Sequence, residues 1–329
     1  MTLSQLRAFC VVVEQGSFRA ASRTLNIAQS ALTHAIQSLE AELAAPLLTR
    51  SHLGISLTPF GERLLVRAGA ILRDCERIDQ DMRELQGQPS GRIALGVTSE
   101  PLAELLMPVL KRFMADYPNV LVHVSSGSSK MLTERIRDGR LDFALCPLAP
   151  NLADADLEID RLYRSTAAVL ARAGHPKAGA TSIDELVDCE WVGFRREGIA
   201  GFAANRLVKM FGERGLGMPK IVLTADTLLE SLYFVSETDY LTVDPGVLAD
   251  LKLFSGALIR IPVRETFSSR DICLVRRSTS PPTTVAQALA SMLASYARLR
   301  RGVTGAGSPH GESDDEDEGE DDDGGSATL

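Results

Sequence analysis

The sequence predicts an N-terminal helical domain with a small β element, then a long single helix, then a C-terminal α/β domain of two lobes. Three patterns predict this order. In residues 1–58, apolar residues recur at steps of three and four, the spacing of amphipathic helices. Residues 60–85 carry heptad spacing. From residue 92 onward, strand and helix patterns alternate in two successive sets.

Two helices are expected before residue 26. The first should end at Gly16, and its inner face is marked by Leu3, Leu6, Phe9, Cys10 and Val13. Ser17 is suited to cap a short second helix over residues 18–25. Asn26 tolerates a left-handed conformation and should begin a three-residue turn over residues 26–28.

A third helix is expected over residues 29–43, with a buried face formed by Leu32, Ile36, Leu39 and Leu43. Its opposite face is polar and carries Ser30, Thr33, His34 and Gln37, with Gln29 at its start. Such side chains suit the edges of bases in a major groove, and helix, helix, tight turn, helix is a helix-turn-helix. An ordinary three-helix core is the alternative. We expect base contacts from Gln29, Ser30, Thr33 and His34, and phosphate or supporting contacts from Ser38 and Arg50.

Residues 46–59 contain two short apolar runs around a glycine turn, which predicts a small β wing and so a winged helix-turn-helix domain over residues 1–59. The helix over 60–85 should then act as a linker. Its apolar stripe suits a two-stranded coiled coil, and packing against its own domain alone is the alternative. The expected dimerisation residues are Leu64, Ala68, Ile71, Cys75, Ile78 and Met82.

Residues 86–91 are rich in Gly, Pro and Ser and predict a hinge. Beyond it, a parallel sheet covered by helices is expected over residues 92–301. The first set of strands is expected at 92–98, 120–124 and 141–145, with helices over 101–117 and 129–137. The second set is expected at 191–194, 221–223 and 240–243, with helices over 199–211 and 227–235. A last strand (272–275) and a closing helix (284–298) follow.

Ligands collect beyond the carboxyl ends of parallel strands, and two such junctions are polar here. Thr98 and Ser99 follow the first strand, and Ser128 and Ser129 follow the second. Hydroxyls and free N–H groups at helix starts favour a carboxylate or sulfonate, although Ser and Thr caps are equally common without a ligand. The Glu100 carboxylate would repel such an anion unless it points away.

The chain resembles the LysR-type transcriptional regulators, densely over roughly the first 65 residues and more loosely to about residue 300. The resembling residues are Phe18-Arg19-Ala20-Ala21, Ala31-Leu32-Thr33, Ile36, Leu39-Glu40, Leu43, Pro46-Leu47-Leu48-Thr49-Arg50 and Leu57-Thr58-Pro59-Phe60-Gly61. The chain departs from the common family pattern at Ser30, His34 and Leu53, where many members have Pro, a basic residue and a basic residue. Base preference therefore does not transfer.

The resemblance implies a regulator that binds promoter DNA as a homodimer or homotetramer, with linker helices paired antiparallel and RNA polymerase as a further partner. It also implies a two-lobed, periplasmic-binding-protein-like effector domain, with lobe I at about 92–161 and 267–301 and lobe II at about 162–266. The family's effector cleft would add Pro147, Leu148 and Phe194 as apolar walls and Arg195 as a cation. A small anionic effector is expected.

Composition excludes several other classes. No run of 18 apolar residues predicts a membrane span, and no secretory signal or disulfide framework is recognisable, so we expect a cytoplasmic protein. Phosphate-loop, nucleophile-elbow and metal-ligand spacings are absent from the sequence, so we expect no enzyme, catalytic residues, metal or cofactor. A solute-binding protein with a helical N-terminal domain that does not bind DNA is the main alternative, disfavoured by the helix-turn-helix and the missing signal.

The formal net charge of −8 is concentrated at the C-terminus. Residues 302–329 hold ten Asp and Glu and no Lys or Arg, which leaves 35 basic and 33 acidic residues in the body. We expect this tail to be disordered. It is either a solubilising extension or a segment that imitates DNA or binds a partner. The first 60 residues carry four Arg against three Glu, so one copy should bind DNA weakly.

Overall fold

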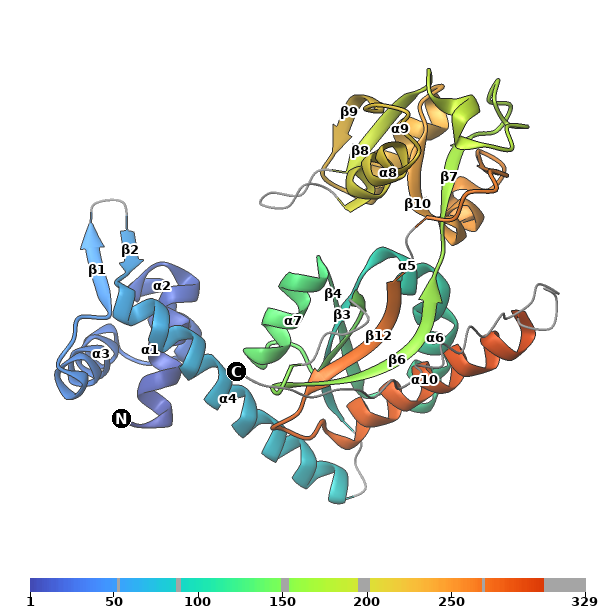
Figure 1. The fold of residues 1–329 in the computed structure, drawn as a ribbon. Helices are drawn as coiled ribbons and strands as arrows, with labels where there is room; N and C mark the ends of the chain where they lie inside the picture. The colour runs from blue at the N-terminus through green and yellow to red at the C-terminus, as the bar shows by residue number, and fades with distance from the viewer. Residues whose placement is uncertain (52–53, 87–89, 149–153, 195–201, 268–269, 305–329) are drawn as a thin grey trace, which may run out of the picture.

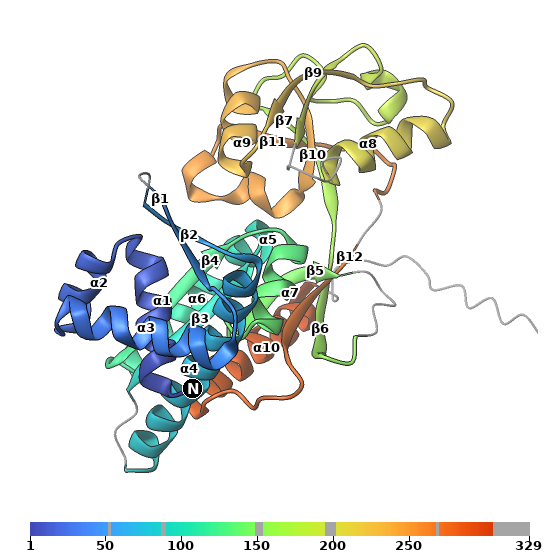
Figure 2. The ribbon, with the colours of Figure 1, turned by 90° about the vertical axis from the view of Figure 1, so that its left-hand side faces the viewer.

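The computed structural model describes residues 1–51, 54–86, 90–148, 154–194, 202–267 and 270–304. The described chain forms a small N-terminal domain, a long helix that leaves it, and an α/β domain of two lobes (Figure 1). Figures 1 and 2 show lobe II above lobe I, and the N-terminal domain at the level of lobe I. This element order confirms the predicted fold class.

The N-terminal domain contains three helices, α1 (Leu3–Gln15), α2 (Phe18–Leu25) and α3 (Gln29–Leu43). Gly16 and Asn26 follow α1 and α2 with left-handed φ values of 62° and 51°, as their residue types predict. Ser17 caps α2, its hydroxyl accepting a hydrogen bond from the Ala20 N–H at 3.1 Å. Side chains of all three helices close one core that includes Phe9, Leu32 and Leu39.

The wing is an antiparallel pair of short strands, β1 (Leu48–Ser51) and β2 (Gly54–Leu57). Glu40 on α3 fixes its start, because one carboxylate oxygen accepts from the N–H groups of Leu47 at 2.7 Å and Leu48 at 3.2 Å. Gly61 lets the next helix pass close to this turn, since a Cβ there would lie 2.1 Å from the Leu47 carbonyl oxygen. The predicted wing is therefore present.

Helix α4 (Pro59–Leu85) connects the N-terminal domain to lobe I. Near its start Leu64 packs against the N-terminal core and Ala68 is fully buried. Near its end Gln80 Nε2 donates to Oγ1 of Thr283, the residue just before the last helix, at 3.4 Å. The linker helix therefore contacts both domains of its own chain.

Lobe I is built on a five-stranded sheet in the order β4-β3-β5-β12-β6. Its strands are β3 (Gly91–Val97), β4 (Val120–Ser126), β5 (Phe143–Leu148), β6 (Leu157–Ser165) and β12 (Arg270–Arg277). β3 pairs in parallel with β4 and β5, whereas β12 is antiparallel to both β5 and β6. The prediction of an all-parallel sheet is wrong for β12. This strand returns from lobe II and so enters the sheet at the edge where β6 leaves it.

The helices of lobe I are α5 (Ser99–Pro101), α6 (Met107–Asp116), α7 (Ser129–Arg137) and α10 (Thr284–Thr304). The sequence predicts one helix over 101–117, but a π-helical turn at Leu102–Leu106 interrupts it. Pro108 explains the irregularity, because it has no N–H to donate to the carbonyl of Glu104. That carbonyl accepts instead from Arg300 Nη1 on α10 at 3.0 Å.

Lobe II contains a three-stranded antiparallel sheet and a parallel strand pair. Its strands are β7 (Ala167–Arg172), β8 (Glu190–Phe194), β9 (Lys220–Ala225), β10 (Thr242–Pro245) and β11 (Leu258–Ile261). Its helices are α8 (Phe202–Glu213) and α9 (Leu228–Glu237), with 3-10 turns at Ile183–Leu186, Gly246–Asp250 and Lys252–Phe254. Fully buried Trp191 packs edge-on against Phe211 in its core, with ring centroids 6.0 Å apart. β7 and β11 were not predicted from the sequence.

Two crossings join the lobes, and the predicted lobe limits shift accordingly. The sheet of lobe I keeps the chain to Ser165, and Thr166 alone separates β6 from β7. On the return, β11 ends in lobe II at Ile261 and β12 begins in lobe I at Arg270. Lobe II therefore begins near residue 166 rather than at 162.

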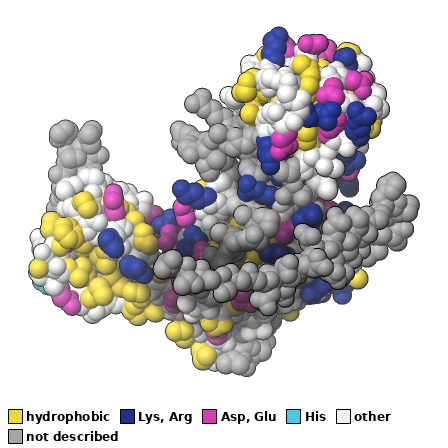
Figure 3. Space-filling view, in the orientation of Figure 1, with side chains coloured by type: hydrophobic (Ala, Val, Ile, Leu, Met, Phe, Trp, Pro, Cys, Tyr) yellow, Lys and Arg dark blue, Asp and Glu magenta, His cyan; other side chains and the backbone are white. Residues whose placement is uncertain are grey.

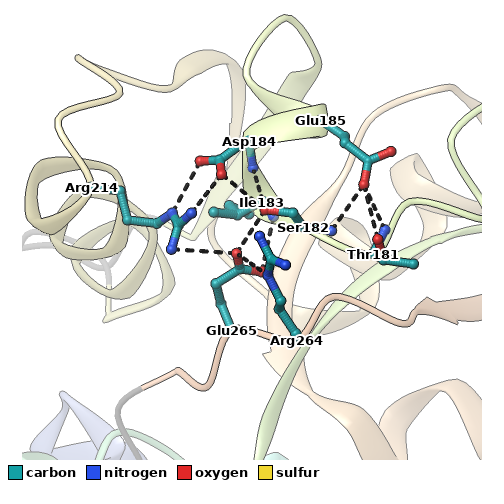
Figure 4. Close-up of polar contacts among 8 residues, drawn as sticks. All are labelled: Thr181, Ser182, Ile183, Asp184, Glu185, Arg214, Arg264 and Glu265. Atoms are coloured by element: carbon teal, nitrogen blue, oxygen red, sulfur yellow. Dashed lines mark hydrogen bonds and ion pairs between the residues drawn. The ribbon is translucent and has the colours of Figure 1, made fainter.

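The return crossing is fastened to lobe II by Glu265 (Figure 4). Its carboxylate accepts from Ser182 Oγ at 2.8 Å and from the Ile183 N–H at 3.0 Å, and Arg214 lies 3.5 Å away. Burial acts to raise the pKa of Glu265, but these hydrogen bonds and Arg214 hold it below its ordinary value. Glu265 is therefore a charged anchor at the end of lobe II.

Candidate DNA-recognition face and effector cleft

The polar face of α3 is accessible, as predicted. Gln29, Ser30 and His34 are exposed and Thr33 is half-buried, while Leu32 on the opposite face is fully buried. These four polar side chains form no hydrogen bond with another described residue, so their polar atoms are available to a ligand. Their role in reading bases stays a prediction.

The two predicted supporting residues differ in their placement. Ser38 is exposed, and its hydroxyl accepts a hydrogen bond from Gln5 Nε2 on α1 at 3.2 Å. Ser38 thus ties the recognition helix to the first helix. The side chain of Arg50 lies outside the described residues, as does Leu53 at the wing tip.

The surface of the N-terminal domain is not strongly basic. Figure 3 shows more hydrophobic than Lys or Arg side chains on its visible face. Leu3 and Leu43 are exposed at helix ends, so their prediction as buried residues is wrong. Phosphate contacts dominate the affinity of most DNA-binding proteins. A single head with so few cations favours an assembly that presents two or more heads.

The predicted dimer seam on α4 divides into two parts. Leu64 packs against the N-terminal core of the same chain, Ala68 is fully buried, and Cys75 is half-buried. Ile71, Ile78 and Met82 are 41%, 59% and 50% exposed. The second half of the helix therefore presents an apolar stripe to the outside, and its pairing with another copy stays a prediction.

The carboxyl ends of β3, β4 and β5 bring the predicted effector loops together. The strand register places Val97 beside both Ser126 and Leu145, so Thr98, Gly127 and Cys146 follow at one edge. The Thr98 hydroxyl is buried and has no hydrogen-bond partner among the described residues. A buried hydroxyl without a partner is costly and points to a ligand or water at this edge.

The other predicted effector hydroxyls differ in how they are used. Ser99 is exposed. Ser128 caps α7 by accepting from the Met131 N–H at 3.2 Å. Ser129 Oγ donates to the Pro147 carbonyl at 2.7 Å, which joins two of the predicted loops directly. Ser99 is thus the hydroxyl most open to a ligand.

The predicted apolar walls are met only in part. Pro147 is half-exposed, but Leu148 is buried in the core of lobe I and so is accounted for without a ligand. The interpretation of Leu148 as a cleft wall is therefore corrected. β8 ends at Phe194, whose side chain is outside the described residues, and Arg195 lies entirely outside them.

A buried cluster of charges, which was not predicted from the sequence, lies where the lobes meet. Glu100 of lobe I is 7% exposed and accepts from Ser165 Oγ, in the crossing strand, at 2.5 Å. Burial raises the pKa of Glu100 to about 7, against the hydrogen bond from Ser165 and the charge of Arg206, which lower it. The carboxylate is thus turned toward the end of β6, where the chain crosses to lobe II, and is partly protonated at neutral pH.

Arg206 on α8 supplies the positive charge of this cluster from lobe II. It is 8% exposed and interacts electrostatically with both Glu100 and the equally buried Asp244. Burial raises the pKa of Asp244, while its hydrogen bond from Thr242 and the charge of Arg206 oppose that rise. The signal in the sequence was a charge on an apolar helix face, since Arg206 lies four residues before buried Met210.

Comparison with known proteins identifies the family. The profile described as "Bacterial regulatory helix-turn-helix protein, lysR family" matches residues 3–62, and that described as "LysR substrate binding domain" matches residues 86–298. The chain belongs to the LysR family of transcriptional regulators. This LysR-type regulator carries a DNA-binding domain and an effector-binding domain. Members of the family bind promoter DNA and small effectors and form oligomers. The family consists of transcriptional regulators rather than enzymes. Membership decides against the solute-binding alternative.

Two curated relatives illustrate the distance within the family. The HTH-type transcriptional regulator GbpR of Azospirillum brasilense is 26% identical over 309 residues, covering 92% of this chain and 89% of the relative. TdcA of Escherichia coli (strain K12) is 26% identical over 261 residues, covering 79% of this chain and 82% of the relative. The similarity thus spans both domains.

Solved structures share the fold of this LysR-type regulator. Full-length CbnR complexed with its target DNA superposes with a TM-score of 0.69 at 19% identity, covering 91% of this chain and 99% of that one. A full-length OxyR variant from Pseudomonas aeruginosa gives a TM-score of 0.63 at 21% identity, with 89% of this chain and 98% of that one covered.

Among the described helices, none has the length and apolar character that a membrane span requires. All five cysteines are free.

Proposed function

We propose that this LysR-type regulator controls its promoter in response to a small organic anion, such as an aromatic carboxylate or sulfonate. The anion would bind where β3, β4 and β5 end. The observation that carries this proposal is the buried Thr98 hydroxyl, which has no hydrogen-bond partner among the described residues. A ligand acceptor within reach of Thr98 and exposed Ser99 would satisfy it.

The surroundings of this edge suit an anion with an apolar body. Half-exposed Pro147 offers apolar surface beside the two polar loops. Arg206 adds a positive charge where the lobes meet. Repulsion from Glu100 is reduced, because that carboxyl is buried against Ser165 and its pKa is raised to about 7. A bound anion in contact with both lobes would favour one arrangement of the lobes over others, and so of the linked DNA heads.

We further propose that Gln29, Ser30, Thr33 and His34 read base edges, and that Ile71, Ile78 and Met82 pair two linker helices. At the promoter, RNA polymerase is the expected protein partner of the bound regulator. The base-reading and pairing roles are supported by the accessibility of these side chains, of which Thr33 alone is half-buried.

Titration calorimetry with a panel of aromatic carboxylates, sulfonates, amino acids and sugars tests the effector class. The best anion should lose about 1–3 kcal/mol of binding free energy in Thr98→Val, because one hydrogen bond to a charged group is removed. Thr133→Val is the matched control, since the buried Thr133 hydroxyl donates within its own helix to the Lys130 carbonyl. Tight binding of a neutral or cationic ligand that ignores Thr98→Val and Ser99→Ala would refute the anion proposal and leave the family assignment intact.

A further inference from the structure

A cavity of about 510 Å³ lies between the linker helix α4 and lobe I, away from the effector edge. Arginines from three elements line it, and two acidic residues accompany them. The charged lining residues are Arg63, Arg67, Arg137, Arg277, Asp138 and Asp156. The cavity is therefore positive by two formal charges, in a protein whose overall charge is −8.

Two of these arginines are available to bind an anion. Arg137 pairs with Asp154, and Arg277 Nη2 lies 3.1 Å from Asp74 Oδ1. Arg63 and Arg67, in contrast, are exposed and have no hydrogen bond or ion pair with a described residue. They are four residues apart and so share one helix face, where two like charges repel. An anion between them would relieve that repulsion.

The two walls of the cavity are held in place by direct contacts. Arg73 Nη2 on α4 donates to the Asp138 carbonyl after α7 at 2.5 Å. One turn later Arg77 Nη2 lies 2.8 Å from Asp142 Oδ1. The cavity is thus a fixed feature of the chain rather than a chance gap between two domains.

We propose that the acidic segment 312–323 of the same chain binds in this cavity. Ten of its twelve residues are Asp or Glu, and residues 302–329 contain no Lys or Arg. The negative charge of the segment is opposite in sign to that of the cavity. The segment would cover a face of the linker helix that directly follows the DNA-binding domain. Tail binding would thus neutralise positive charge next to that domain.

The chain is long enough for this contact. The Gln80–Thr283 hydrogen bond places the start of α10 against α4, and the 21 residues of α10 carry its end about 31 Å away. Arg67 lies 13 residues before Gln80 on α4, about 20 Å further, so the path is at most about 51 Å. Residues 305–323 can span about 60 Å when extended. The acidic segment can therefore run back past α10 to the linker helix. A tether raises the local concentration of the tail above that of a free peptide, so a weak contact gains population.

A single extended peptide fits this site better than duplex DNA does. The cavity is bounded on one side by α4 and on the other by the α7 end of lobe I. A space of about 510 Å³ between these walls admits one extended chain, whereas a duplex could contact only its rim. DNA binding at this face is the competing outcome of the test.

Carbodiimide cross-linking of the full-length protein tests the proposal. In Arg67→Lys the positive charge is kept, and an amine is introduced at the mouth of the cavity. The reagent first adds to a carboxylate oxygen and activates the carboxyl group. The amine then attacks the carbonyl carbon, an amide bond forms, and the reagent leaves as its urea. Trypsin releases the tail as one peptide after Arg301, so mass spectrometry can identify the product.

Arg112→Lys on α6 is a stringent control, because the Arg112 side chain is 82% exposed. The contact between Arg300 and the Glu104 carbonyl places the end of α10 beside the helical segment that leads into α6, so a freely moving tail should meet this site often. The tail should cross-link several-fold more at Arg67→Lys than at Arg112→Lys. The excess should disappear at about 1 M salt, where the Debye length is about 3 Å.

Equal yields at the two positions, or an excess that salt does not reduce, would overturn the proposal. A competing result would be equal cross-linking together with weaker binding of random duplex DNA by Arg63→Gln/Arg67→Gln. The arginine pair would then be a phosphate-contacting surface, and the tail would not be its ligand.

Discussion

Arg77 and Asp142 join the linker helix to the sheet of lobe I through a contact of 2.8 Å between Nη2 and Oδ1. Both side chains are largely buried, at 17% and 10% exposure. The other oxygen of Asp142 accepts from the Ala94 N–H on β3 at 2.7 Å. Because β3 leads to Thr98 at the proposed effector edge, this pair lies on a direct physical route from that edge to α4.

We therefore expect a measurable coupling between Arg77 and Asp142. A double-mutant cycle of Arg77→Ala and Asp142→Ala, followed by denaturant unfolding, should give an interaction energy of about 1–3 kcal/mol, as contacting residues do. The matched control is Arg112 with Asp116, a pair 3.9 Å apart with 82% and 56% exposure, whose coupling should be near zero. Equal couplings in the two cycles would mean that burial does not strengthen the pair.

The raised pKa of Glu100 predicts a pH dependence of stability. Its pKa rises from 4.5 to about 7 on folding, so the native state binds more protons than the unfolded state between these values. Stability contributed by Glu100 must then fall as pH rises through this window, and stay low above it. Glu100→Gln keeps an acceptor for Ser165 and removes the charge.

Unfolding of both proteins at about pH 5 and about pH 8 measures this effect. The free energy of unfolding of Glu100→Gln minus that of the wild type should be about 1–3 kcal/mol higher at the higher pH than at the lower pH. Glu76→Gln on α4 is the control, because Glu76 is an exposed carboxylate that does not contribute to the raised pKa of Glu100. A difference between wild type and Glu100→Gln that is the same at both pH values would show that the carboxyl is not held protonated.

The N-terminal domain could be predicted from the sequence because its signals are local. Gly16 and Asn26 mark the ends of helices by the conformations that their residue types favour, and both adopt positive φ. Leu32, Ile36 and Leu39 fix which face of α3 is buried, and so which face is polar. The candidate base-reading residues follow from that face alone.

The α/β domain was predicted less completely because strand direction and pairing are not local. β12 has the same apolar pattern as a parallel strand, and its antiparallel direction follows only from its return out of lobe II. The proposed effector edge at Thr98 and Ser99 could be located from the sequence, since polar residues follow an apolar strand. Arg206 and Asp244 were missed, because they meet Glu100 only after α8 and β10 have packed together.

Alanine substitutions on α3 test the recognition face. His34→Ala or Thr33→Ala should cost about 1–3 kcal/mol of binding free energy on the cognate operator and little on random DNA, because base contacts carry the sequence preference. Footprinting upstream of its own gene would supply the operator, and fluorescence anisotropy the affinities. Gln15→Ala, an exposed change at the end of α1, should leave both affinities unchanged. If His34→Ala and Thr33→Ala bind the operator as well as the wild type, α3 does not read the bases.

A charge on the outer face of the linker helix tests the proposed pairing of subunits. Ile78 is 59% exposed in one chain, so Ile78→Asp should leave the single chain folded. In a paired helix the carboxylate would be buried without a partner, at a cost of several kcal/mol. Leu229→Asp on α9 is the matched control, because Leu229 is also apolar and 58% exposed. Analytical ultracentrifugation should then show a smaller species for Ile78→Asp alone, with weaker operator binding because two heads no longer act together.

An unchanged assembly for Ile78→Asp would place the interface elsewhere. Dissociation by both variants would mean that any added charge disturbs the assembly.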